Sequence, residues 1–134
     1  MNKPVRLYEA IYVSTLLPDA PLSVISVIAS GARVKNRALG LTGLLIFDGM
    51  RFCQQLEGSQ KEVLSLLERI REDARHVDLE ILHHGPLAAR RFNSFSLAYA
   101  PIEDVDALAA LEKLDGEAAV EAFLGLIATL DLQG

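Results

Sequence analysis

The chain has 134 residues, a length typical of one domain, and 51% of them are hydrophobic while 23% are charged, as in a compact soluble protein. Its net charge of −5 is uneven: residues 1–101 carry 12 Lys and Arg against 10 Asp and Glu, whereas residues 102–134 carry one Lys against 8 Asp and Glu. The charge pattern argues against a nucleic-acid-binding stripe, and the lack of a run of ~18 apolar residues argues against a membrane span. The single cysteine, Cys53, excludes an intrachain disulfide and a cysteine-cluster metal site. Together with the lack of an apparent signal peptide, these features predict a cytoplasmic protein.

Strand-like and helix-like stretches alternate along the first part of the chain. The dipeptide Asp48-Gly49 between two apolar runs predicts a tight hairpin, and Ser59 with Glu62 forms a capping box that opens a helix. The expected elements are a strand over residues 5–14, a helix from about Pro21 to Asn36, strands over 41–47 and 51–58, a helix from Ser59 to about Asp73, and strands over 77–85 and 92–100.

The order β-α-β-β-α-β-β predicts an α+β fold with a ferredoxin-like sheet and two helices on one face. Residues 102–114 and 116–132 are expected to add a pair of acidic amphipathic helices. We therefore expect one domain over residues 1–101 and an appendage over residues 102–134. The appendage would cover the free face of the sheet or meet its counterpart in a dimer, through the apolar side chains Val120, Phe123, Leu124 and Ile127.

An amide on the core-facing side of the hairpin needs an explanation. Side chains alternate faces along a strand, so Gln54 is predicted to point toward the core with Met50, Phe52 and Leu56. The alternate set, which is Arg51, Cys53, Gln55 and Glu57, is predicted to face solvent.

Candidate catalytic groups are few. His83 and His84 are adjacent on a strand and face opposite ways, so they cannot both bind one metal ion, and no nucleophile motif or phosphate-binding loop is present. Glu57 before a turn is expected to be solvated rather than a general base. We therefore do not expect an enzyme.

Several uncharged polar groups are instead predicted to converge on the inner face of the sheet. Tyr12 would lie beside Gln54 if the first and third strands are neighbours, and Asn36 ends a helix that packs on the same face. Each could be satisfied separately: Gln54 by backbone, Tyr12 by solvent, and Asn36 as a helix C-cap. Together with Ile28 and Phe52, however, they describe a flat apolar slot with a few polar contacts, which suits a planar heteroaromatic ligand.

Five segments in this order and spacing resemble the BLUF family of blue-light sensors, which bind FAD non-covalently. The resemblance covers about residues 5–101. The segments are IYVS, ARVKNRALGLTGLLIFDG, RFCQQLEG, ERIREDARH and RRFNSFSL.

The resemblance implies a role for each candidate residue. Tyr12 corresponds to the photoactive tyrosine and Gln54 to the glutamine between it and the flavin. After blue-light excitation, Tyr12 would give the flavin an electron, a proton would pass through Gln54, and recombination would leave Gln54 rearranged. The remaining flavin contacts would come from Asn36 at the pyrimidine edge, Ile28 and Phe52 along the ring, and Lys35, Arg75 and His76 nearby.

Two residues depart from the family pattern. Phe95 and Leu97 stand where many members have tryptophan and methionine, which puts the relay through the fifth strand in question. The resemblance implies a homo-oligomer that signals to a downstream protein partner. One alternative is a ferredoxin-like interaction module that does not use a flavin. A third possibility, a small acylphosphatase-like hydrolase, is weakened by the lack of a phosphate-binding loop.

Overall fold

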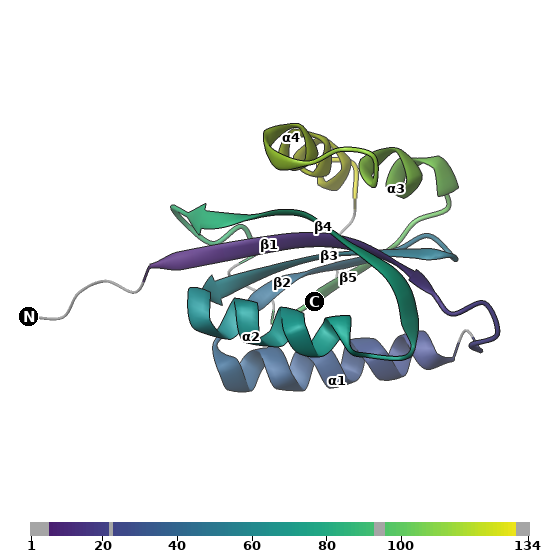
Figure 1. Ribbon diagram of the computed structural model, residues 1–134, viewed down its shortest axis with the longest axis horizontal. Coiled ribbons are helices and arrows are strands. Elements are labelled where there is room, and N and C mark those ends of the chain that lie inside the picture. Colours follow the sequence, from purple (N-terminus) through teal and green to yellow (C-terminus); the bar gives the residue numbers. More distant parts are fainter. Residues whose placement is uncertain (1–5, 22, 93–95, 131–134) are drawn as a thin grey trace, which may run out of the picture.

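The structure, a computed structural model, describes residues 6–21, 23–92 and 96–130 and contains one five-stranded sheet with helices on both faces (Figure 1). The expected α+β, ferredoxin-like fold is confirmed. The elements in chain order are β1 (Leu7–Leu16), α1 (Val24–Leu39), β2 (Thr42–Phe47), β3 (Arg51–Ser59), α2 (Gln60–Arg71), β4 (His76–Leu87), β5 (Ala98–Pro101), α3 (Val105–Leu111) and α4 (Gly116–Ile127).

The strands follow the order β4-β1-β3-β2-β5, in which β5 runs parallel to β2 and all other neighbours are antiparallel. This arrangement makes β1 and β3 neighbours, as the predicted topology assumed. Tyr12 on β1 lies directly opposite Gln54 on β3. The centre of the sheet therefore carries both residues on one face.

Helices α1 and α2 lie side by side on the inner face of the sheet, which is the face that bears Tyr12 (Figure 1). Helix α2 begins as expected, because the Ser59 side chain accepts a hydrogen bond from the Glu62 N–H at 3.3 Å. Helix α1 ends three residues later than expected. Gly40 caps it in the left-handed region (φ 70°), so Asn36 lies inside the last turns and is not a C-cap.

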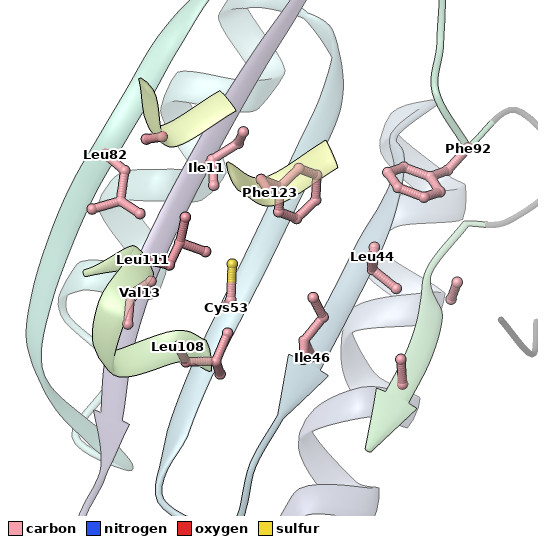
Figure 2. Close-up of a cluster of buried hydrophobic side chains, with 13 residues drawn as sticks. Ile11, Val13, Leu44, Ile46, Cys53, Leu82, Phe92, Leu108, Leu111 and Phe123 are labelled. Atoms are coloured by element: carbon pink, nitrogen blue, oxygen red, sulfur yellow. The ribbon is translucent and has the colours of Figure 1, made fainter. Parts of the chain in front are cut away.

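Helices α3 and α4 lie across the opposite, outer face of the sheet (Figures 1 and 2). Phe123 of α4 and Leu108 of α3 are fully buried there against sheet residues such as Ile11. Because this face is covered, the expectation of a solvated alternate set on β3 is wrong. Cys53, Gln55 and Glu57 are all 0% exposed.

Other boundaries also differ from the expectation. Strand β5 is confined to Ala98–Pro101, since Ser96 and Leu97 form a bend rather than an extended strand. Met50 lies in the hairpin turn and is 52% exposed rather than facing the core. Phe95 lies outside the described residues. In the part of the chain that the structure describes, no helix is long and apolar enough to cross a membrane.

Candidate functional site

A cavity of about 250 Å³ lies between α1, α2 and the inner face of the sheet, slightly below the usual range of ~300–1,000 Å³ for small-molecule sites. It separates the two inner-face hydrophobic clusters, one under each helix. All eight residues expected at a ligand site line it. The lining consists of Tyr12, Val27, Ile28, Gly31, Ala32, Lys35, Asn36, Leu45, Phe52, Gln54, Leu66, Arg69, Ile70, Asp73, Arg75 and His76.

Tyr12 and Gln54 form a buried hydrogen-bonded pair in the sheet wall of this cavity. The Tyr12 hydroxyl donates to Gln54 Oε1, and both residues are only 4% exposed. Burial raises the pKa of Tyr12 well above its usual value, so the hydroxyl stays protonated and remains a donor. Since Oε1 is engaged, the Gln54 amide nitrogen is left to donate elsewhere along the cavity wall.

Asn36 enters the cavity wall from α1 with half of its amide engaged. Its Nδ2 donates to the Ser96 carbonyl at 2.7 Å, which ties α1 to the segment before β5. Its Oδ1 is buried and has no hydrogen-bond partner among the described residues. A buried acceptor without a partner is costly, so this oxygen marks a position where a ligand N–H would be stabilised.

His76 and Arg75 follow α2 and close one end of the cavity. His76 Nε2 donates to the Ile70 carbonyl at 2.5 Å, and its Nδ1 lies 2.7 Å from Ser14 Oγ, so the imidazole is held by both α2 and β1. Arg75 lines the cavity but its Nε donates to Asp73 Oδ1 at 2.9 Å. This hydrogen bond holds the pKa of Asp73 below its usual value.

The remaining walls are apolar on both sides of the polar centre. Ile28 on α1 and Phe52 on β3 face the cavity, and Phe52 is buried against Phe47 with ring centroids 4.8 Å apart. Leu97 is also buried in this inner-face cluster, where it packs with Phe52. A slot with apolar sides and polar groups at its centre fits a flat ring that has heteroatoms along its edge.

Sequence reasoning missed several lining residues. Leu66, Ile70 and Asp73 recur at helical spacing on and just after α2, and Arg69 lies on the same side. The sequence shows that spacing, but an apolar stripe on a helix is equally typical of a side that packs in the hydrophobic core. The burial of Gln55 and Glu57 on the opposite face of β3 was not predicted, because it depends on residues far away in the chain.

No described group of three or more His, Cys, Asp and Glu side chains is placed to hold a metal ion. His83 and His84 indeed have different partners. His83 Nε2 lies 3.6 Å from Glu9 Oε2, and the Tyr8 hydroxyl is hydrogen-bonded to His84 Nδ1.

Comparisons with known proteins identify the family of this chain. The model of the BLUF family, described as sensors of blue light using FAD, matches residues 7–98. The blue light- and temperature-regulated antirepressor BluF of Escherichia coli (strain K12) is 35% identical over 86 residues, which are 64% of this chain and 21% of that protein. Photoactivated adenylate cyclase subunit beta of Euglena gracilis is 37% identical over 70 residues, which are 52% of this chain and 8% of that protein.

The chain therefore spans only about a fifth or less of the length of these two relatives. A solved structure of similar size is the dark state of BlrB, a BLUF protein, with a TM-score of 0.78 and 31% identity over 92% of this chain and 96% of that chain. The family match covers well over half of the chain, from β1 into β5. The chain belongs to the BLUF family of blue-light sensors that use FAD.

Proposed function

We propose that this chain is a photoreceptor in which the isoalloxazine ring of FAD occupies the cavity between α1 and α2 and the Tyr12–Gln54 pair responds to its excitation. The single observation that carries the proposal is the buried hydrogen bond from Tyr12 to Gln54 in the wall of that cavity. A buried amide at this point has both a donor and an acceptor, so it can connect the phenol to a ligand.

The side chains present fit a flavin. The unpartnered Oδ1 of Asn36 would accept a hydrogen bond from the ring N–H of the pyrimidine edge. The Gln54 Nε2 group would donate to a ring nitrogen or carbonyl, and Ile28 and Phe52 would contact the ring faces or edges. A cavity of about 250 Å³ suits the ring system, with the rest of FAD extending out of its mouth.

Two cationic side chains of the cavity lining suit the part of FAD that would extend out of the cavity. Lys35 on α1 and Arg69 on α2 both line the cavity and are exposed to solvent. Neither has a carboxylate within salt-bridge distance among the described residues, whereas Arg75 is already paired with Asp73. We propose that Lys35 and Arg69 meet the phosphates of FAD, where their positive charges would favour a phosphorylated flavin over riboflavin.

When bound, FAD absorbs blue light and accepts an electron in its excited state. Tyr12 would supply that electron, and its hydroxyl proton has a ready acceptor in Gln54 Oε1. Returning both the electron and the proton to Tyr12 after the amide has rotated or tautomerised would leave Gln54 with its donor and acceptor exchanged. This exchange rewires the hydrogen bonds on both sides of Gln54 without changing the net charge of the buried site.

Such a chain would act as a sensor and not as an enzyme, and would pass its signal to another protein. We propose that residues 1–101 form the flavin-binding domain and that residues 102–134 form an appendage on its outer face. A homo-oligomer, a downstream protein partner and a cytoplasmic location stay predictions.

The experiment is reconstitution of the purified protein with FAD, FMN and riboflavin, followed by absorption spectroscopy of the bound fraction. The proposal expects a yellow protein whose flavin is retained on gel filtration. A protein that stays colourless after incubation with FAD would support the alternative, a ferredoxin-like interaction module without a flavin.

A further inference from the structure

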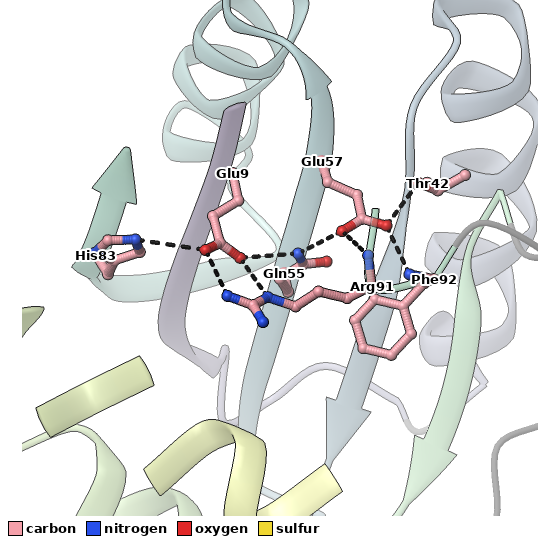
Figure 3. Close-up of polar contacts among 7 residues, drawn as sticks. All are labelled: Glu9, Thr42, Gln55, Glu57, His83, Arg91 and Phe92. Atoms are coloured by element: carbon pink, nitrogen blue, oxygen red, sulfur yellow. Dashed lines mark hydrogen bonds and ion pairs between the residues drawn. The ribbon is translucent and has the colours of Figure 1, made fainter. Parts of the chain in front are cut away.

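The outer face of the sheet carries a buried polar cluster behind the Tyr12–Gln54 pair. We call Glu9, Gln55, Glu57 and Arg91 the outer-face cluster (Figure 3). Glu9 is 2% exposed, and Gln55 and Glu57 are 0% exposed. Two carboxylates so deeply buried must be compensated by hydrogen bonds or positive charge, and the cluster provides both.

Gln55 joins the two carboxylates. Its Nε2 donates to Glu9 Oε1 at 3.1 Å and to Glu57 Oε2 at 2.9 Å. Its Oε1 is buried and has no partner among the described residues. Turning the amide over would place this oxygen against two carboxylates, so the orientation of Gln55 is fixed by its neighbours.

Glu57 holds the backbone of a segment that is distant in sequence. The backbone N–H groups of Arg91 and Phe92 donate to its two carboxylate oxygens at 2.8 and 2.7 Å, and the Thr42 hydroxyl donates at 2.9 Å. With the bond from Gln55, these donors use the whole hydrogen-bonding capacity of the Glu57 carboxylate.

Glu9 holds the side chain of the same segment. Arg91 Nε and a terminal guanidinium nitrogen donate to its two oxygens at 2.9 and 3.0 Å, a bidentate pair. Burial by itself would raise the pKa of Glu9. The hydrogen bonds from Arg91 and Gln55 and the positive charge of Arg91 outweigh burial, so the pKa is lower than usual and Glu9 remains ionised.

The cluster lies one residue away from the Tyr12–Gln54 pair along β3. Gln55 follows Gln54 directly, so one peptide group connects a side chain in the cavity wall to one in the cluster. The Gln55 carbonyl packs closely against Gly43 of the neighbouring β2, where a Cβ would lie 2.0 Å from the carbonyl oxygen. A backbone shift at Gln54 would therefore be passed directly to Gln55 and its hydrogen bonds.

The segment that the cluster holds contacts the core under α3 and α4, which we call the tail helices. The Phe92 ring is buried in the outer-face core together with Phe123 of α4 (Figure 2). Movement of the Phe92 backbone would therefore change the packing of α3 and α4 on the sheet.

We propose that Gln55 is a positioning residue that transmits the rearrangement of Gln54 to Arg91 and Phe92, and from there to the tail helices. This inference rests on the proposed function. It supplies a route through the sheet to its outer face that needs neither the tryptophan nor the methionine that Phe95 and Leu97 replace.

The test compares four FAD-loaded proteins: wild type, Gln55→Met, Arg91→Lys and the control Arg51→Lys. Gln55→Met removes the bridge while Glu57 keeps three donors and Glu9 keeps Arg91, so the segment stays attached. Arg91→Lys keeps the charge but loses the bidentate pair. Arg51 forms a half-buried ion pair with Glu112 at 2.8 Å on the same face, outside the cluster.

Two readouts are taken from each protein, in darkness and under blue light: the flavin absorption spectrum and hydrogen exchange at residues 88–101 and in α4. In wild type and Arg51→Lys, illumination should shift the flavin spectrum and change the exchange. In Gln55→Met and Arg91→Lys, the spectral shift should persist while most of the light-induced difference in exchange is lost.

The inference is overturned if Gln55→Met keeps the full exchange difference, if wild type shows the spectral shift without any exchange difference, or if Arg51→Lys loses the difference to the same extent. Absence of the spectral shift in wild type would instead overturn the proposed function, and the relay with it.

Discussion

Tyr12 and Gln54 occupy directly opposed positions on β1 and β3, and the buried hydroxyl of Tyr12 donates a hydrogen bond to the side-chain oxygen of Gln54. The register of two strands thus sets the geometry of the pair, and the cavity adjoins it. Because the phenol and the amide are held by the backbone of neighbouring strands, each can be replaced without moving the other far.

The first prediction separates this pair from flavin binding. Tyr12→Phe keeps an aromatic ring in the cavity wall, and Gln54→Leu keeps a side chain of similar size, so both variants should bind FAD. Neither should give a stable light-induced red shift, because phenylalanine has no proton to pass on and leucine cannot bridge a donor and an acceptor. The measurement is the absorption spectrum before and after illumination.

Tyr8→Phe is the matched control, since Tyr8 lies on the same strand and is hydrogen-bonded to His84, outside the cavity lining. It should photocycle as wild type does. Normal photocycling of Tyr12→Phe or Gln54→Leu would show that the role proposed for that residue is wrong.

A second prediction concerns Asn36, whose Oδ1 has no partner in the described part of the chain. Asn36→Ala should weaken FAD binding by roughly tenfold, which corresponds to one lost hydrogen bond of about 1–1.5 kcal/mol. Titration of apoprotein with FAD, followed by flavin fluorescence, measures this change.

Asn36 also binds the Ser96 carbonyl, so the control is Arg33→Gln, which removes the neighbouring bond from Arg33 Nε to the Leu97 carbonyl. Arg33 is absent from the cavity lining, and this variant should keep nearly the full affinity. An equal loss of FAD affinity in the two variants would mean that Asn36 acts only by anchoring residues 96–97.

A third prediction addresses the tail helices. Phe123 of α4 is fully buried against the outer face of the sheet, so Phe123→Ala should lower the free energy of unfolding by about 3–5 kcal/mol. Truncation after Pro101 should uncover the whole outer-face core and cause aggregation or a clear loss of thermal stability.

Val105→Ala is a suitable control, because Val105 is 52% exposed on α3 and its replacement should change stability by less than about 0.5 kcal/mol. Chemical denaturation monitored by circular dichroism provides the comparison. A truncated protein as stable and as monodisperse as the full chain would contradict a structural role for the tail.

The fourth prediction follows from the lowered pKa of Glu9. A carboxylate whose pKa is lower in the folded protein stabilises the fold above its unfolded value of 4.5, and that contribution is lost as the pH falls through the folded value. Wild type should therefore be more stable than Glu9→Gln at pH 7, and the difference should shrink below about pH 4.5.

Denaturant titrations at pH 7, 5, 4 and 3 would measure the difference. Glu68→Gln serves as the control, since Glu68 is exposed and, among the described residues, its carboxylate forms one long surface ion pair, with Arg71 at 3.8 Å. A gap between wild type and Glu9→Gln that is the same at every pH would contradict the ionised, buried Glu9.

The placement of the Tyr12–Gln54 pair could be predicted from the sequence because it follows from strand alternation and from the order of the elements. Strand alternation puts Gln54 on the inner face, and the β-α-β-β-α-β order makes β1 and β3 neighbours. Helical spacing likewise brings Ile28 and Asn36 to one side of α1. These rules account for Tyr12, Gln54, Phe52, Ile28 and Asn36 in the cavity wall, whereas Lys35, Arg75 and His76 were expected there only from the resemblance to the BLUF family.

The outer face could not be predicted in the same way. Gln55 and Glu57 alternate with inward residues and would be solvated on an uncovered sheet, but residues 91–92 and the tail helices bury them. Asn36 was compatible with a C-cap until Gly40 was found to take the left-handed conformation that ends α1. Both outcomes depend on contacts that local sequence patterns do not contain.

The most direct test of the account is the light-minus-dark absorption spectrum of the FAD-loaded wild-type protein. The account predicts a small red shift of the flavin bands under blue light that recovers fully in the dark. Cys53 should have no part in it, because its thiol is buried on the opposite face and burial raises its pKa to about 12. A spectrum that does not change, or one that bleaches as a covalent flavin adduct does, would contradict the switch at Tyr12 and Gln54.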